Sequence, residues 1–163
     1  MTQTETDRAA GQLQAQEDGM VLDSFDHADA WRLGTAMVER ALRDRLSVII
    51  DIQRPGLVLF RSALAGTTAE NQAWLARKAE TVFRFEASTA LLSERFAAQG
   101  VDVWTAPWFD ANRFTTAGGS VPVRVRGVGV VAAVTVSGLS SKEDHDFAVE
   151  ELDAFRRGGA VTP

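Results

Sequence analysis

The sequence of 163 residues contains no cysteine. Disulfide bonds, thiolate nucleophiles and thiolate metal ligands are therefore excluded. No stretch approaches the run of about 18 apolar residues that crosses a bilayer, and the first 19 residues lack the apolar core of a secretory signal. These absences predict a cytoplasmic protein without membrane attachment.

Positive charge is also scarce, because 17 Lys and Arg residues stand against 22 Asp and Glu residues, for a net charge of −5. A nucleic-acid binder needs a concentrated basic surface to displace counterions from phosphates, so this balance argues against one. Arg124 and Arg126 form a local basic pair, but charges on alternate residues are typical of the solvated face of a strand. Hydrophobic residues make up 45% of the chain, which suits one globular domain with a real core.

Residues 1–18 are polar and bury little, so they are expected to form a flexible tail with transient helix at most. The single folded domain is expected over residues 19–158, followed by a short C-terminal tail over residues 159–163.

The remaining pattern predicts helices and strands in the order helix, two strands, two helices, two strands, helix. Helical spacing of apolar residues predicts four helices, over 27–45, after 66–68, over 87–98 and over 141–157. β-Branched runs predict four strands, over 47–52, 57–64, 121–126 and 128–137. The short turns between paired strands imply antiparallel hairpins, and hence an α+β sheet sandwiched by helices.

Three helix starts carry capping signals. Asp26 is followed by Asp29, and Ser140 by Glu143. Thr67 with Glu70 also fits the capping-box pattern. Each pair predicts that a helix begins directly after its first member.

A long irregular stretch, residues 101–120, contains Trp104, Pro107 and Trp108. A loop of this length inside a compact domain indicates a functional segment, a packed excursion or an oligomer contact. The sequence leaves these three alternatives open.

Two glycine-containing turns are candidate anion sites. The Gly118-Gly119-Ser120 turn could present backbone N–H groups to an anion, although the pattern favours a plain chain reversal before a strand. Ser137-Gly138 ends a strand and leads into a helix N-terminus, which suits carboxylate or phosphate, or is simply a tight turn. Neither turn has the spacing of a P-loop.

His145 and Lys78 are the candidate side chains. His145 lies in the first turn of a predicted helix and could ligate a metal or haem iron, or serve as a surface or capping residue. Lys78 follows Trp74 by four residues and is a pocket cation or a lysine whose stem packs over the indole. No serine–histidine–acid arrangement, nucleophile elbow or zinc-type spacing occurs, so no catalytic residue or metal site is predicted.

Two segments together resemble a known family. Residues 51–85, DIQRPGLVLFRSALAGTTAENQAWLARKAETVFRF, and residues 118–152, GGSVPVRVRGVGVVAAVTVSGLSSKEDHDFAVEEL, resemble the uncharacterised branch of the haem-degrading-domain (GlcG/HbpS-like) superfamily. The resemblance covers residues 25–157. It implies profilin-like α/β/α layers around a central, mainly antiparallel five-stranded sheet, with the fifth strand near residues 20–25, and assembly into dimers or larger homo-oligomers.

The resemblance also implies a site and a function. The positions that match the recurring motifs of the branch, and hence the expected ligand-binding residues, are Lys78, Gly118, Gly119, Pro122, Ser137, Gly138 and His145, with Asp144 beside the last. The implied function is that of an oligomeric small-ligand-binding protein for haem or another anionic cofactor or metabolite. Val121 and Glu86–Thr89 depart from the branch pattern and reshape the expected pocket.

Two alternatives stay open. The aromatic loop 104–114 and the lack of a catalytic arrangement suit a non-enzymatic assembly or adaptor protein. An enzyme acting on a small anion, with Lys78 and the Ser137-Gly138 turn as its site, is the weaker of the two.

Overall fold

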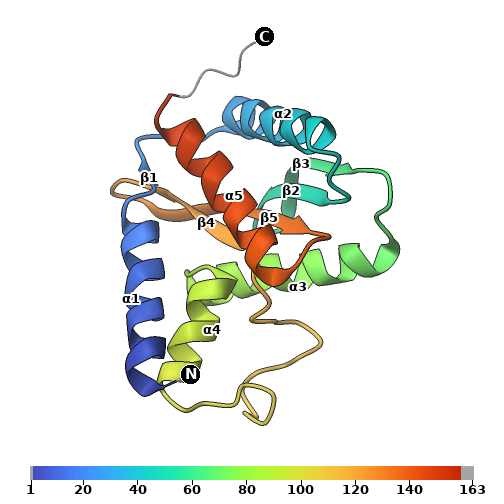
Figure 1. Cartoon of the computed structure of the whole chain (residues 1–163). Helices are drawn as coiled ribbons and strands as arrows, with labels where there is room; N and C mark the ends of the chain where they lie inside the picture. The colour runs from blue at the N-terminus through green and yellow to red at the C-terminus, as the bar shows by residue number, and fades with distance from the viewer. Residues whose placement is uncertain (1, 159–163) are drawn as a thin grey trace.

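The computed structural model describes residues 2–158 (Figure 1). Its elements, in chain order, are α1 (Gln3–Asp18), β1 (Val21–Leu22), α2 (His27–Arg43), β2 (Ile49–Arg54), β3 (Leu57–Ala63), α3 (Ala69–Phe85), α4 (Thr89–Ala98), β4 (Ser120–Val125), β5 (Gly129–Ser137) and α5 (Ser141–Arg156). Within this part of the chain, no helix has the length and apolar character that a membrane span requires.

The strands form one five-stranded sheet in the order β1-β4-β5-β2-β3. β1 pairs in parallel with β4, and every other neighbouring pair is antiparallel. The predicted α+β class and mainly antiparallel five-stranded sheet are therefore confirmed, including a fifth strand before α2. β5 lies at the centre and is buried from Ala132 to its end, because helices cover both of its faces.

The main core lies between the sheet and the pair α2 and α5. Ile50 and Ile52 of β2 share this core with apolar residues of the other elements, namely Leu33, Met37, Val134, Val136, Phe147 and Leu152. Truncating such a fully buried side chain to alanine costs about 2–5 kcal/mol. Because side chains alternate along a strand, β2 and β5 turn their other residues toward α3, which covers the opposite face of the sheet (Figure 1).

Two of the three predicted helix caps are confirmed. The Asp26 carboxylate accepts from the Asp29 N–H at 2.9 Å, and the Ser140 hydroxyl accepts from the Glu143 N–H at 3.3 Å. The third cap lies one residue later than predicted, because Asn71 accepts from the Thr68 N–H at 2.8 Å. The Thr67 hydroxyl instead donates to the carbonyl of Leu64 at 2.8 Å.

The first segment differs from the flexible tail that its composition predicts. Residues 3–18 form α1, which lies beside α4 (Figure 1). Ala10 and Leu13 pack on a small apolar cluster of Ala87, Leu91 and Leu92. Glu17 is 2% exposed and accepts from the Ser88 N–H at 2.7 Å. These tertiary contacts order a helix whose own sequence has little apolar periodicity. The predicted C-terminal tail, 159–163, lies outside the described residues.

The long loop between α4 and β4 is a packed excursion, one of the three alternatives that the sequence left open. Val103, Phe109 and Phe114 form a buried cluster against the aromatic rings of Phe85 and Phe96. Arg113 of the loop pairs with Glu80 of α3 at 2.7 Å, which anchors the loop. Trp104 and Trp108 remain 58% and 53% exposed.

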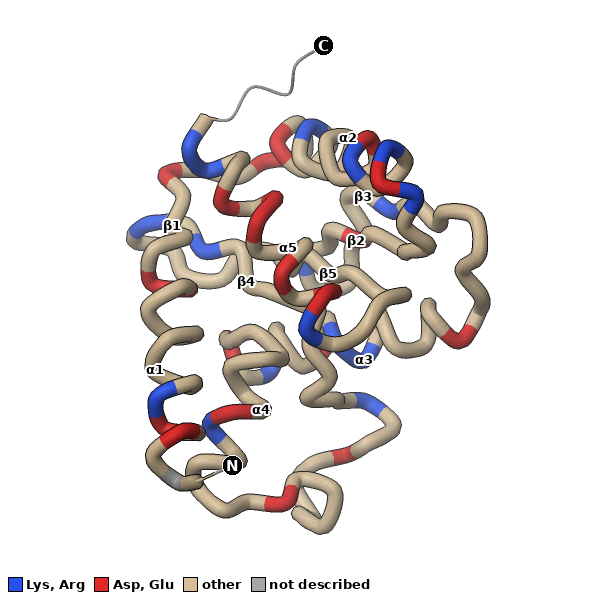
Figure 2. The backbone as a smooth tube through the Cα atoms, in the orientation of Figure 1, with Lys and Arg blue, Asp and Glu red and all other residues tan. Residues whose placement is uncertain are grey.

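Acidic and basic positions are interspersed over the molecule. Figure 2 shows both signs along α2. Charge contacts join α2 to α5, where Arg40 bonds to Glu150 and Glu151 at 2.7 and 2.8 Å.

Candidate functional site

One cavity of about 750 Å³ opens between α1, α4, the first turns of α5 and the loop before β4. Its volume lies within the range of about 300–1,000 Å³ that is usual for small-molecule sites. The residues that line it are Ala9, Gln12, Leu13, Gln16, Trp74, Ala90, Ser93, Glu94, Trp104, Thr115, Thr116, Ala117, Gly118, Ser141, Lys142, His145 and Asp146. The lining therefore combines apolar alanine and indole surface with amides, hydroxyls and two acids.

His145 is a deeply enclosed polar residue of the lining, with 4% of its surface exposed. Its Nε2 lies 3.1 Å from the side-chain oxygen of Gln16, and its Nδ1 is buried without a partner. Burial lowers the pKa of His145 below its usual value of 6.5. The imidazole is therefore neutral at physiological pH, which is the form that coordinates metals.

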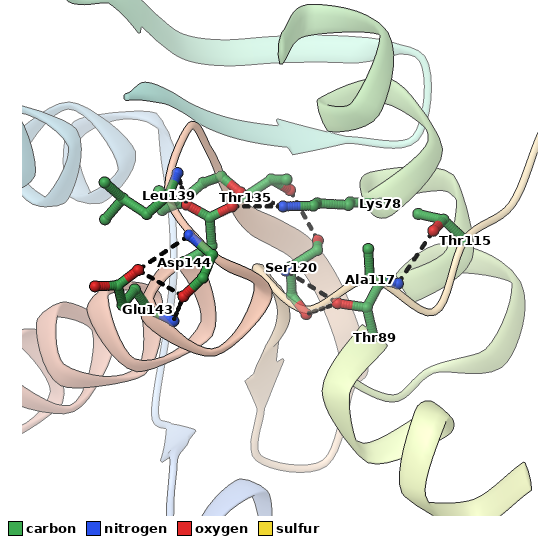
Figure 3. A network of polar contacts seen from close by, with 11 residues as sticks. Lys78, Thr89, Thr115, Ala117, Ser120, Thr135, Leu139, Glu143 and Asp144 are labelled. Carbon is green, nitrogen blue, oxygen red and sulfur yellow. Dashed lines mark hydrogen bonds and ion pairs between the residues drawn. The ribbon is translucent and has the colours of Figure 1, made fainter. Parts of the chain in front are cut away.

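Lys78 lies behind the cavity, and its ammonium does not line it. Its Nζ donates to Asp144 Oδ2 at 2.8 Å and to the carbonyl of Val136 at 3.0 Å (Figure 3). The other oxygen of Asp144 accepts from the Leu139 N–H at 3.0 Å. Burial lowers the pKa of Lys78 and raises the pKa of Asp144, because both charges are removed from water. The pair ties α3 to the start of α5, directly beside His145.

The Gly118-Gly119 turn brings the loop against this ion pair. A Cβ on Gly118 would lie 2.4 Å from the carbonyl oxygen of Ser141. Gly119 has a φ of +127°, and a Cβ there would lie 2.5 Å from the Val136 oxygen and 2.7 Å from Lys78 Nζ. Both glycines are therefore required by close backbone approach, and Gly118 alone of the two lines the cavity.

The remaining predicted site residues lie away from the cavity. Pro122 is buried in β4 opposite Ala133, and Ser137 ends β5 opposite Ile49. Gly138 follows with a φ of +151°, and a Cβ there would lie 2.1 Å from the carbonyl oxygen of Ser47.

The start of α5 is already occupied by oxygens of the chain itself. The Asp144 carboxylate accepts from Leu139, and the Ser140 hydroxyl accepts from Glu143. These contacts favour the tight-turn interpretation of Ser137-Gly138 over an anion site.

Comparison with known proteins assigns the chain to a family. The family model described as "Haem degrading protein HbpS-like" matches residues 25–153. The chain belongs to this family.

Relatives within the family extend over nearly the whole chain. The UPF0303 protein SCO2848 of Streptomyces coelicolor is 42% identical over 155 residues, which cover 95% of this chain and 98% of that protein. The UPF0303 protein BMEI0598 of Brucella melitensis biotype 1 is 40% identical over 147 residues, 89% of this chain and 86% of the relative.

Solved structures share the HbpS-like fold. The crystal structure of the Ybr137w protein superimposes with a TM-score of 0.85 at 28% identity and covers 95% of this chain and 94% of that one. The crystal structure of a PduOC:heme complex gives a TM-score of 0.68 at 22% identity, with 80% of this chain and 94% of that chain covered. At 22% identity the likeness concerns the fold.

Several residues of this HbpS-like cavity were missed by sequence reasoning. Gln16 of α1 and Ser93 and Glu94 of α4 carry no motif, and α1 was expected to be flexible.

Sequence reasoning also missed a polar network beside the ion pair of Lys78 and Asp144. Ser120 Oγ lies 2.8 Å from Thr135 Oγ1, and the Ser120 N–H donates to Thr89 Oγ1 at 3.3 Å (Figure 3). This network fixes the start of α4 to the sheet beside the cavity.

Among residues 2–158, no group of three or more His, Asp or Glu side chains is arranged to hold a metal ion. The cavity therefore offers one imidazole and no ligand cluster. It suits an organic ligand, or a metal that arrives within one.

Proposed function

We propose that the protein binds a flat organic ligand in the cavity between α1, α4 and α5, and that haem is the first candidate. The observation that carries this proposal is His145, a buried and neutral imidazole with an unpaired Nδ1 in the wall of a cavity of about 750 Å³. The family description names haem degradation, and a heme complex of a PduOC protein shares the fold, which supports haem among flat ligands.

The lining residues fit haem in three respects. The neutral imidazole of His145 would hold the iron of a haem, and the bound haem would supply the redox and oxygen chemistry of that iron. Leu13 and Ala90 give apolar lining from α1 and α4, and Lys142 is the basic residue of the lining, which would have to leave its ion pair with Asp146 to bind a propionate. Coordination through Nε2 requires Gln16 to release its hydrogen bond to the ring.

Hemin titration tests the proposal. Purified protein is expected to shift the Soret band of hemin with saturation, and His145→Ala is expected to weaken binding by at least about 10-fold. The control is His27→Ala, because His27 is the other histidine of the chain and lies exposed at the start of α2. An absent Soret shift in the wild type, or equal binding by His145→Ala, would contradict haem binding at this site.

A second candidate function is non-enzymatic assembly through self-association. β3 is an edge strand of the described sheet, and Leu57 and Val58 are 51% and 45% exposed on it. Trp31 of the adjacent α2 is 65% exposed and contacts the ring of Phe60. An apolar strand edge with unpaired backbone groups favours pairing with another chain. The aromatic loop gives less support, because Phe109 and Phe114 are buried within it.

A further inference from the structure

Glu94 of α4 is an acidic side chain in the cavity wall that has no partner. Its Oε2 is buried and unbonded, and neither carboxylate oxygen makes a hydrogen bond or ion pair within residues 2–158. The other side chains with an unbonded buried atom each make a contact through a different atom. They are Glu17 with Ser88, Asp51 with Arg61, Arg54 with Phe25, and His145 with Gln16.

An unbonded buried carboxylate oxygen is costly. Removing a polar group from water without a compensating hydrogen bond costs about 1–3 kcal/mol by mutational measures, and more for a charge. Native structures leave few such groups, and an unsatisfied one indicates a partner that completes it. Because Glu94 lines the cavity, a ligand held there is in position to supply that partner.

The charge balance of the lining points to the kind of partner. Lys142 pairs with Asp146 one turn later on α5, so these two charges cancel. His145 adds none, since burial lowers its pKa and keeps it neutral. Arg95, the neighbour of Glu94 in the chain, donates to Gln14 instead. Glu94 therefore leaves one unmatched negative charge in the cavity wall.

The cavity also supplies aromatic surface. Trp74 and Trp104 line it from α3 and from the loop before β4. The guanidinium of Arg77 lies 3.9 Å from the ring centroid of Trp74, which restrains the indole. Indoles favour flat rings and cations, whereas an unmatched carboxylate disfavours an anion.

We propose that the ligand is a neutral or cationic flat nitrogen heterocycle that donates an N–H hydrogen bond to Glu94. This inference rests on the proposed binding of a flat organic ligand in this cavity and adds the charge and the donor that the ligand presents. It favours a ligand other than haem, because the pyrrole nitrogens of haem bind iron and its propionates are anionic.

Two acridines of the same three-ring frame test the inference. 9-Aminoacridine is a cation with N–H donors, and acridine-9-carboxylate is an anion. In equilibrium dialysis against the full chain, the wild type is expected to bind the amine at least about 10-fold more tightly. Glu94→Gln is expected to remove this preference, because the amide carries no charge. Ser93→Ala, which alters the adjacent lining residue, is expected to retain it.

Each other outcome overturns the inference. It falls if the two acridines bind equally, if neither binds, or if Glu94→Gln keeps the preference while its far-ultraviolet circular dichroism matches the wild type. Hemin titration separates the two proposals. A hemin complex that depends on His145, without an acridine preference, leaves the proposed function standing and removes the role of Glu94. If neither the hemin complex nor the acridine preference is observed, both the proposed function and the role of Glu94 are contradicted.

Discussion

At the scale of single residues, the ion pair of Lys78 and Asp144 joins α3 to the start of α5 inside the fold. Both side chains are almost fully buried, with 3% and 2% of their surfaces exposed. Two charges placed in the interior are tolerated because they compensate each other and because Val136 and Leu139 complete their hydrogen bonds. Removal of one charge therefore leaves the other buried without a counter-charge, which destabilises the folded state.

Lys78→Met is expected to destabilise the protein by about 3–5 kcal/mol, because the Asp144 carboxylate loses its counter-charge inside the fold. Urea unfolding measures this change. The matched control is the double variant Lys78→Met with Asp144→Asn, which removes both charges and keeps an acceptor for the Leu139 N–H. It is expected to be more stable than the single variant. Wild-type stability in Lys78→Met would show that the pair contributes nothing.

Local chemistry made some residues predictable from the sequence. The caps at Asp26 and Ser140 depend on side chains three residues away, so spacing alone reveals them. The partner of Lys78 is 66 positions distant, and the sequence contains no signal that joins the two. The resemblance marked Lys78 and Asp144 as motif positions, but their contact and the exclusion of Lys78 from the cavity emerge from the fold.

At the scale of elements, α1 shows how tertiary contacts order a segment that is polar along most of its length. Glu17 accepts from the N–H of Ser88, the residue that caps α4, and lies 3.6 Å from Arg124 of β4. One carboxylate thus joins the end of α1 to a helix start and to a strand. These long-range contacts leave no signal in the composition or the apolar periodicity of the segment, which is why residues 3–18 were expected to be flexible.

Glu17→Ala is expected to loosen α1 while the sheet stays folded, because it leaves the Ser88 N–H without its acceptor. A lost buried hydrogen bond to a charged group costs about 1.5–3 kcal/mol. Native-state hydrogen exchange is expected to quicken in α1 and in the first turn of α4. Asp18→Ala, a change at the adjacent exposed acid of the same helix, serves as the control. Unchanged exchange in Glu17→Ala would contradict this anchoring.

At the scale of the whole molecule, the hairpins β2-β3 and β4-β5 were predictable because their turns are short and their strands are consecutive in the chain. The central pairing of β2 with β5 joins Ile49 to Ser137, far apart in sequence, and no local pattern specifies it. The five-stranded sheet was accordingly implied by the family resemblance, whereas its strand order emerges from the structure. The cavity shares this origin, since its walls come from segments spread over most of the chain.

The exposed edge of β3 yields a prediction for the assembly. If the chain forms a homo-oligomer by pairing of β3, Val58→Glu is expected to shift the mass measured by light scattering toward the monomer. The introduced carboxylates would repel each other across the paired edge and would lose their hydration there. Val128→Glu is the control, since Val128 is 71% exposed in the turn between β4 and β5. A wild-type protein that is monomeric at micromolar concentration, or equal masses for the two variants, would contradict self-association through this edge.

The family model matches residues 25–153 and so begins after α1, yet α1 forms one wall of the cavity. The part of the chain that the family model matches and one wall of the cavity therefore lie in different stretches of sequence. A change to the terminal helix would alter the cavity lining at Gln12, Leu13 and Gln16. A protein engineer can vary this lining by exchanging the first 18 residues among relatives, provided that the exchange keeps Glu17, which anchors the helix to Ser88.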